Sequence, residues 1–312
     1  MLKGKEFLEK IEKNIGKVIV GKENIIKMLT VCLIADGHVL LEDVPGTGKT
    51  KLAKALSRSI DLDYSRIQFT PDLLPGDITG LNIYNRKENE FELRKGPVFT
   101  NILLADEINR ATPRTQAGLL ECMEERQVTI DGETYGLKKP FFVIATENPI
   151  ETAGTFPLPE AQLDRFMMKL SMGLPTEKEE IDILKMYMTD DPLLTLESVT
   201  DEEELLNLRE EAKKVTVHED ILKYMTEIVD ATRSLDGVVM GVSPRGLINL
   251  LKCVKAAAYL NGRDFATPDD VKEVAVNVLA HRVITGYGNT GKNSDLIENI
   301  IKETKVPTEV FS

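Results

Sequence analysis

Features that would place this chain in a membrane or outside the cell are missing from its sequence. No apolar run approaches the roughly 20 residues that span a bilayer, and the N-terminus has no signal-peptide core. Cys32, Cys122 and Cys253 lie far apart and form no C-x-x-C pair, so we expect small core residues and neither a disulfide framework nor a metal site. The histidines show no metal-ligand spacing either. These absences predict a cytoplasmic protein without membrane insertion.

An excess of positive charge is also missing. The 312 residues include 39 basic and 51 acidic side chains, which gives a net charge of −12. Proteins that coat nucleic acid usually carry the opposite sign, so nucleic acid is an unfavoured partner. A short cluster of Arg86, Lys87, Arg94 and Lys95 could form a local basic site, although scattered surface charge is the simpler reading. The length is sufficient for two domains.

The sequence does contain a glycine turn between an apolar strand and a helix. Residues 43–50 match the phosphate-loop pattern G-x-x-x-x-G-K-[ST] except at Asp43, whose carboxylate would repel phosphates unless it points away. Gly46 and Gly48 would let backbone N–H groups surround an anion at the start of the helix. Lys49 would neutralise the β- and γ-phosphates, and the Thr50 hydroxyl would take one Mg²⁺ position. The expected nucleotide contacts here are Pro45, Gly46, Thr47, Gly48, Lys49, Thr50 and Lys51.

Apolar runs alternate with helical segments up to residue 172. The candidate strands are residues 39–41, 64–69, 101–105, 141–146 and 167–171. Strands separated by helices predict an α/β core with a mainly parallel five-stranded sheet that binds ligands at its carboxyl ends. Two predicted hairpins, near 81–93 and 128–135, are not needed to complete the sheet. They fit either contact devices or inert surface loops.

From residue 175 the pattern predicts helices only. We therefore expect a nucleotide-binding α/β core at 1–173 and an all-α domain at 174–312. Five helix starts support the second domain, each with a residue suited to an N-cap. These residues are Thr176, Thr200, Thr216, Ser243 and Thr267.

Two apolar runs end in polar residues that suit phosphate chemistry. The run at 101–105 precedes Asp106, which could complete a Mg²⁺ shell, and Glu107, which could activate a water for attack on the γ-phosphate. The run at 141–146 precedes Asn148, whose amide could bind the γ-phosphate or that water. Alone, the acidic pair could begin a solvated loop and the asparagine could simply turn the chain. Their order after a phosphate loop favours a nucleotide site.

The order of these motifs resembles the MoxR family of AAA+ ATPases, in the clade with a helix-2 insert. The resemblance includes Leu-Pro-Glu-Ala-Gln-Leu-Asp-Arg-Phe at 158–166 and Gly-Val-Ser-Pro-Arg-Gly at 241–246, and it extends from Ile19 to about Val283. It implies a five-stranded AAA+ core, a helical lid and a ring, typically a hexamer. The family's phosphate loop commonly lacks the first glycine, as at Asp43. The two hairpins match its helix-2 and pre-sensor-1 inserts.

The resemblance also implies roles for individual residues. It assigns Lys49 and Thr50 to Walker A, Asp106 and Glu107 to Walker B, Asn148 to sensor 1, Arg165 to the arginine finger, Arg245 to sensor 2, and Val20 and Gly21 to the adenine border.

The two arginine assignments differ in their physical support. Arg245 lies in the first turn of a Ser-Pro-capped helix, which fixes its direction, and a planar bidentate donor suits phosphate. Arg165 could instead pair with the adjacent Asp164, and Arg110 and Arg114 are alternative fingers.

The implied function is ATP hydrolysis with Mg²⁺ that remodels or matures protein partners, as a chaperone does. Many proteins of the family act with a von Willebrand factor A domain. Because this chain shows no such domain, the resemblance implies a separate partner protein that contains one. The alternatives are the motor subunit of a metal chelatase, a nucleic-acid motor of the same clade, and a nucleotide-gated scaffold with little turnover. The net charge of −12 disfavours the nucleic-acid motor, and the intact catalytic motifs disfavour the scaffold.

Overall fold

The centre of the molecule is a five-stranded sheet, seen in a computed structural model that describes residues 2–150, 154–188, 190–286 and 293–307. The strand order is β2-β5-β8-β1-β9, and every neighbouring pair is parallel. The strands are β1 (Val39–Glu42), β2 (Tyr64–Gln68), β5 (Ile102–Asp106), β8 (Phe142–Glu147) and β9 (Met168–Leu170). The predicted α/β fold class and its five strands are therefore confirmed, with ends that differ by a single residue.

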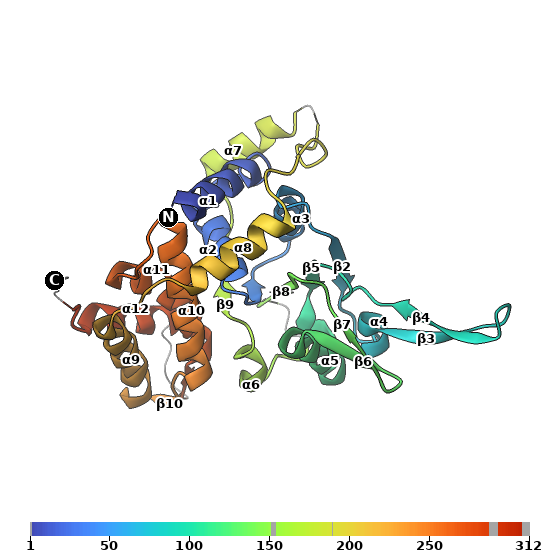
Figure 1. Ribbon diagram of the computed structural model, residues 1–312. Coiled ribbons are helices and arrows are strands. Elements are labelled where there is room, and N and C mark those ends of the chain that lie inside the picture. Colours follow the sequence, from blue (N-terminus) through green and yellow to red (C-terminus); the bar gives the residue numbers. More distant parts are fainter. Residues whose placement is uncertain (1, 151–153, 189, 287–292, 308–312) are drawn as a thin grey trace.

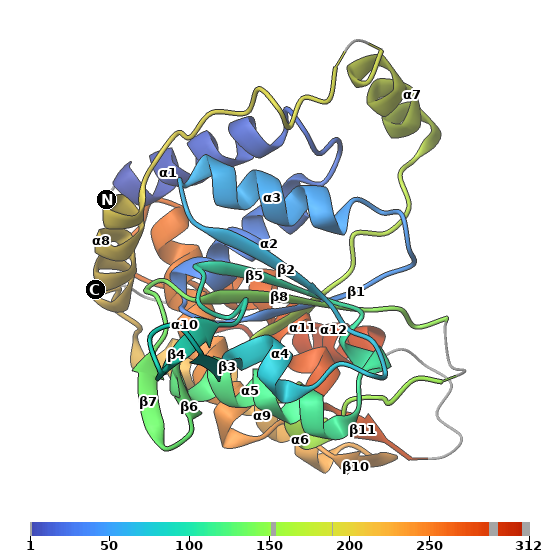
Figure 2. The ribbon, with the colours of Figure 1, turned by 90° about the vertical axis from the view of Figure 1, so that its right-hand side faces the viewer.

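Helices cover both faces of this sheet (Figure 2). One face packs against α1 (Leu2–Ile15), α2 (Glu23–Ile34) and α3 (Lys49–Ser59), and the other against α4 (Pro75–Thr79) and α5 (Pro113–Glu125). Successive strand residues alternate between the two cores: Leu104 belongs to the first, whereas Leu103 and Ala105 belong to the second. This double burial explains why the central strands appear in the sequence as continuous apolar runs.

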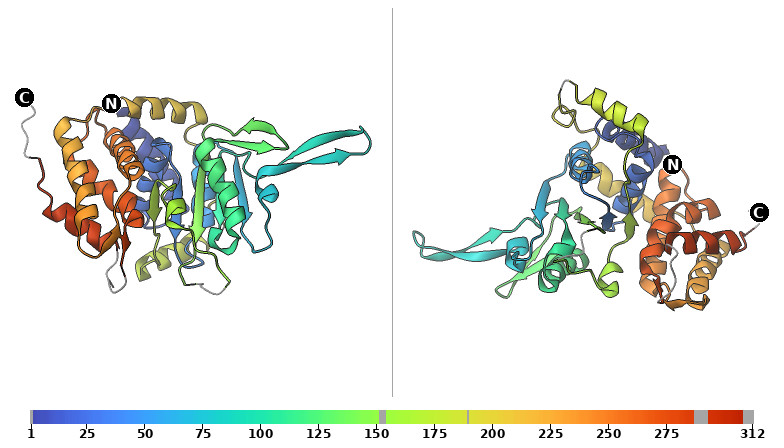
Figure 3. Two further views of the ribbon diagram at one scale, coloured as in Figure 1. Left: turned by 90° about the horizontal axis from the view of Figure 1, so that it is seen from below. Right: turned by 180° about the vertical axis from the view of Figure 1, so that it is seen from behind.

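Both predicted hairpins are present. β3 (Gly80–Asn85) pairs with β4 (Glu90–Lys95), and β6 (Gln127–Ile130) pairs with β7 (Glu133–Gly136). The β3–β4 hairpin projects far from the sheet (Figures 1 and 3). It carries Tyr84 and Phe91, which are 46% and 72% exposed and whose rings contact each other.

The C-terminal part is a helical bundle with one small sheet. Its helices are α8 (Glu202–Lys213), α9 (Glu219–Ser234), α10 (Pro244–Leu260), α11 (Pro268–Leu279) and α12 (Asn293–Glu303). The expectation of helices only was wrong, because β10 (Val238–Met240) pairs with β11 (Ile284–Thr285). These strands are too short to show an alternating pattern, and Val239 and Met240 are exposed.

Three of the five predicted N-caps are correct. Thr176 and Thr267 form capping boxes, and Ser243 accepts a hydrogen bond from the N–H of Gly246 (3.1 Å). The start of α8 is instead capped by Asp201 and that of α9 by His218. Thr216 cannot serve as a cap because its backbone is paired with the strand-like segment around Phe265.

Residues 174–188 and 190–200 run along the α/β core (Figure 1). This segment contains α7 (Glu177–Met186), and its later part is bonded to α1 and α3: the Asn14 amide donates to the carbonyl of Glu197 and the N–H of Val199 to the carbonyl of Ser59, both at 2.9 Å. One continuous apolar core joins α1 and α2 to α8 and α10. The division at residues 173 and 174 stays a prediction. Within the described residues, no helix is long and apolar enough to cross a bilayer.

Candidate functional site

The loop between β1 and α3 has the backbone that the sequence predicts. Gly46 and Gly48 both adopt left-handed conformations, with φ of +86° and +94°. α3 begins at Lys49, so its N-terminal N–H groups face the loop. The Lys49 ammonium donates to the carbonyls of Asp43 (2.8 Å) and Val44 (3.4 Å). Burial lowers the pKa of Lys49, whereas the nearby carboxylates of Asp43, Asp106 and Glu107 oppose that shift.

Asp43 is compatible with a phosphate site because its carboxylate points away from the loop. It accepts hydrogen bonds from the Ser171 hydroxyl (3.0 Å) and from the N–H groups of Met172 (2.6 Å) and Gly173 (3.0 Å). The side chain therefore ties the loop to the segment that follows β9.

Asp43→Ala is expected to lower the free energy of unfolding by about 2–4 kcal/mol, because it leaves three donors around a buried position without their charged acceptor. Urea denaturation measures this change. Asp236→Ala, at an exposed position, is the matched control. An Asp43 variant as stable as that control would contradict this structural role.

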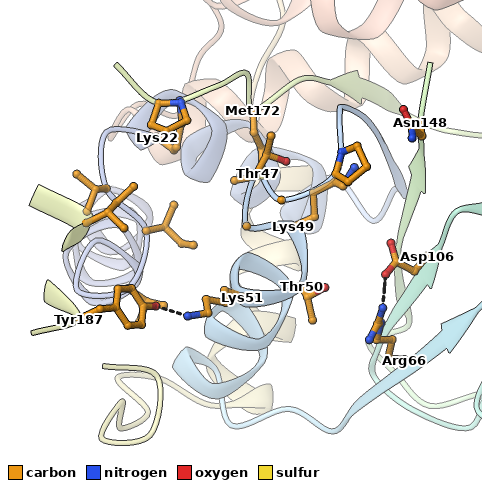
Figure 4. A pocket seen from close by; sticks show the side chains of 18 of the residues that line it. Lys22, Thr47, Lys49, Thr50, Lys51, Arg66, Asp106, Asn148, Met172 and Tyr187 are labelled. Atoms are coloured by element: carbon orange, nitrogen blue, oxygen red, sulfur yellow. Dashed lines mark hydrogen bonds and ion pairs between the residues drawn. The ribbon is translucent and has the colours of Figure 1, made fainter. Parts of the chain in front are cut away.

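A cavity of about 500 Å³ opens beside the loop (Figure 4). The residues predicted to bind phosphate and the attacking water lie at its polar end, where three neighbouring strands end. Its other end is mainly apolar. The polar lining comprises Gly46, Thr47, Gly48, Lys49, Thr50, Arg66, Asp106, Glu107 and Asn148, and the apolar lining includes Val18, Ile19, Val20, Met172, Pro175, Ile183 and Tyr187. Pro45 and Lys51 also line it, so every predicted loop contact does.

Asp106 lies at the end of β5 between two partners. It accepts hydrogen bonds from the Thr146 hydroxyl (2.7 Å) and from the guanidinium of Arg66 (2.6 Å). Arg66 was missed by sequence reasoning, although it lies on β2 beside β5. The usable signal was the predicted parallel sheet, because parallel strands bring the end of β2 to the same sheet edge as the end of β5.

Glu107 and Asn148 are also held in place. Glu107 has a left-handed backbone (φ +57°), and its carboxylate accepts from the Gln68 amide (2.7 Å) and contacts Arg110 Nε (3.0 Å). Asn148 is 4% exposed, and its Oδ1 accepts from the N–H of Ile150 (3.2 Å). The alternative finger Arg110 therefore contacts the site of its own chain.

The two residues expected at the adenine border differ in their position relative to the cavity. Val20 lines the cavity, but Gly21 is not among the lining residues. Gly21 has φ +68°, and a Cβ there would lie 1.7 Å from Oε1 of Glu179, so the glycine lets the start of α7 pack closely. Tyr187, which follows α7, was missed: its hydroxyl accepts from the Lys51 ammonium at 2.5 Å.

Glu147, the residue before Asn148, carries an unusual pKa. Burial raises the pKa of Glu147 to about 7. The nearby Lys169 ammonium lowers this pKa, and the nearby Glu42 carboxylate raises it. A carboxyl group with a raised pKa stabilises the fold while protonated and loses that contribution as pH rises from about 4.5 to about 7.

The stability of the wild-type protein should therefore fall by about 2 kcal/mol between pH 5 and pH 7.5 relative to Glu147→Gln, which stays neutral. Denaturant midpoints at several pH values test this. Parallel pH profiles of the two proteins would show that Glu147 does not titrate in this range.

Arg165 and Arg245 do not line this cavity; they lie together elsewhere. Both bind Glu124 near the end of α5: Arg165 Nε lies 3.2 Å from one carboxylate oxygen, and an Arg245 nitrogen lies 2.5 Å from the other. They line a second cavity of about 540 Å³. Arg245, expected to bind phosphate as sensor 2, therefore lies outside the first cavity of its own chain, because α10 begins beside α5.

The possible ion pair between Arg165 and Asp164 is also not observed. The Asp164 carboxylate instead accepts from Arg282 Nε (2.8 Å) and from the Ser243 hydroxyl (3.1 Å). Arg114, the remaining alternative finger, lies exposed in the first turn of α5.

Comparisons with known proteins agree with this geometry. Residues 38–168 match the model of the ATPase family associated with various cellular activities (AAA), and residues 230–300 match the AAA lid domain. The chain is 52% identical over 278 residues to YeaC of Bacillus subtilis, covering 89% of this chain and 87% of that protein. It is 41% identical over 290 residues to Chaperone MoxR1 of Mycobacterium tuberculosis, covering 90% and 76%.

A solved structure is similar to this chain over nearly its whole length. The crystal structure of a candidate ATPase from Cytophaga hutchinsonii has a TM-score of 0.89 and 40% identity, covering 98% of this chain and 97% of that one.

Proposed function

The chain belongs to the MoxR family of AAA+ ATPases, and from that premise we propose that it assembles into a ring, a hexamer by the family pattern, and hydrolyses ATP with Mg²⁺ to remodel or mature protein partners. The observation that carries this proposal is the separation of the expected catalytic groups. The cavity holds the phosphate loop, Asp106, Glu107 and Asn148, whereas Arg165 and Arg245 lie outside it. One chain therefore supplies parts of two sites.

The residues present fit a magnesium ion. Thr50 and Asp106 lie on facing sides of the cavity (Figure 4) and offer the hard oxygen donors that Mg²⁺ prefers. No cluster of three or more acidic, cysteine or histidine side chains suited to a metal occurs among the described residues. In nucleotide sites Mg²⁺ is usually held by one or two protein oxygens together with phosphates and water. When bound, the ion would neutralise the charge that develops on the phosphates.

The side chains of the cavity can share the remaining work. Lys49 and the loop N–H groups bind the β- and γ-phosphates, and the apolar end holds the base. Glu107 accepts a proton from the attacking water, and Asn148 orients that water or the γ-phosphate. For this, Glu107 must exchange its contacts with Gln68 and Arg110 for the water.

Arg165 and Arg245 would act on the nucleotide of a neighbouring subunit. A head-to-tail ring places the same face of each subunit against the opposite face of the next, so one chain's arginines can complete the next chain's cavity. A guanidinium suits this role because it donates two parallel hydrogen bonds to phosphate oxygens.

Protein clients are favoured over nucleic acid. A similar protein is named a chaperone, the net charge is −12, and the β3–β4 hairpin exposes the aromatic side chains of Tyr84 and Phe91. A von Willebrand factor A domain protein is the partner that the family pattern suggests.

Turnover measured against protein concentration, with mass by light scattering with and without Mg-ATP, tests the proposal. We expect turnover per subunit to rise as a ring forms. A monomer with constant turnover, or one that binds ATP but stays inactive at every concentration, would contradict it.

A further inference from the structure

Glu124 is the meeting point of two arginines from different parts of the chain. It lies on α5, whereas Arg165 follows the short helix α6 (Glu160–Leu163) and Arg245 lies in the first turn of α10. Each guanidinium contacts a different oxygen of the same carboxylate, at 3.2 Å and 2.5 Å. Figure 1 shows α6 between α5 and the helical bundle. Neither sequence motifs nor the comparisons assign Glu124 a role.

The backbone beneath these side chains is tied together separately. Arg282, whose side chain is 1% exposed, donates to the Asp164 carboxylate and to the carbonyls of Asp164 (3.1 Å) and Phe166 (2.6 Å). Ser243, the N-cap of α10, also donates to Asp164. The segment of Arg165 and the start of α10 therefore keep their relative positions without Glu124. Glu124 instead fixes the positions of the two guanidinium groups.

Two physical effects make that control necessary. The two guanidinium groups carry like charges, and they would repel each other if the Glu124 carboxylate did not lie between them. Long arginine side chains also lose considerable rotamer freedom when fixed, so without a partner they would sample many positions. The three side chains remain 32% to 44% exposed, which leaves room for phosphate oxygens to approach.

We propose that Glu124 is a positioning residue that holds Arg165 and Arg245 as one unit, aimed at the phosphates of a neighbouring subunit's nucleotide. This inference rests on the proposed function. Glu124 does not touch the nucleotide of its own chain, because it does not line that cavity.

Glu124→Gln tests the inference, with Glu121→Gln as the matched control. Glu121 is exposed one turn earlier on α5, and among the described residues it shows no ion pair. Glu124→Gln should lower kcat roughly ten- to hundredfold with little change in KM for ATP, because misplaced groups slow the chemical step while the chain's own cavity is intact. Glu124→Asp, which retains a carboxylate, should lose less activity.

Mixing separates positioning from general damage. Subunits with Lys49→Ala cannot use ATP but keep both arginines and Glu124, so adding them to Glu124→Gln subunits should restore part of the turnover. No recovery in mixed rings, or a Glu124→Gln protein as fast as or faster than wild type, would overturn the inference. If Arg165→Ala is also harmless, the proposed function fails with it; if only Glu124→Gln is harmless, the inference fails alone.

Discussion

Arg165→Ala is expected to lower ATP turnover by about 10³–10⁵-fold while leaving ATP affinity nearly unchanged. The affinity should persist because Arg165 does not line the cavity of its own chain. The turnover should fall because the transition state of a neighbouring site loses a planar cation. Steady-state turnover and equilibrium binding of a fluorescent ATP analogue measure the two quantities separately.

Arg114→Ala is the matched control for this prediction. Arg114 is exposed and was the remaining alternative finger. A large loss with Arg114→Ala and none with Arg165→Ala would transfer the finger role to Arg114. Weaker ATP binding by Arg165→Ala would instead place Arg165 in the site of its own chain.

Glu107→Gln is expected to slow hydrolysis by about 10²–10⁴-fold and to retain ATP binding. The amide keeps the size of the side chain but cannot accept the proton of an attacking water. The backbone supports this position, because the Glu107 N–H donates to the Thr146 hydroxyl (2.8 Å) and fixes the turn after β5. Single-turnover rates with bound ATP measure the chemical step directly.

Glu42→Gln serves as the control for Glu107. Glu42 ends the neighbouring strand β1, pairs with Lys169 at 2.6 Å and does not line the cavity. We expect that variant to hydrolyse ATP at nearly the wild-type rate. Undiminished turnover of Glu107→Gln would refute the role of Glu107 as general base.

The parts of the site that sequence reasoning predicted depend on local order. The phosphate loop needs only a strand, glycines with left-handed backbone and a helix start, and all three are adjacent in the chain. Asp106 and Asn148 could be predicted because parallel strands end at one sheet edge, so residues just after apolar runs converge there.

The parts that sequence reasoning missed depend on contacts between distant segments. Arg66 binds Asp106 and Tyr187 contacts Lys51, across 40 and 136 residues of sequence. Neither residue belongs to a motif, and nothing in its local pattern indicates its partner. The sequence indicates that Asp43 must point away from phosphate. The residues after β9 that bind its carboxylate could be identified only from the structure.

The position of Arg245 shows the same limit. Its place in a Ser-Pro-capped first turn was predicted correctly, since capping is local. Which site it faces depends on where α10 packs, and that is set by Asp164, Ser243 and Arg282. Motif order does not encode this packing.

The most direct test of a shared active site is to mix two variants that are inactive alone. Arg165→Ala subunits keep their nucleotide cavity, and Lys49→Ala subunits keep their arginines. In an equal mixture that exchanges subunits, roughly a quarter of the sites should combine both intact parts and recover turnover. Mixed rings that form, as shown by light scattering and pull-down of a tagged subunit, but recover no turnover would contradict the account.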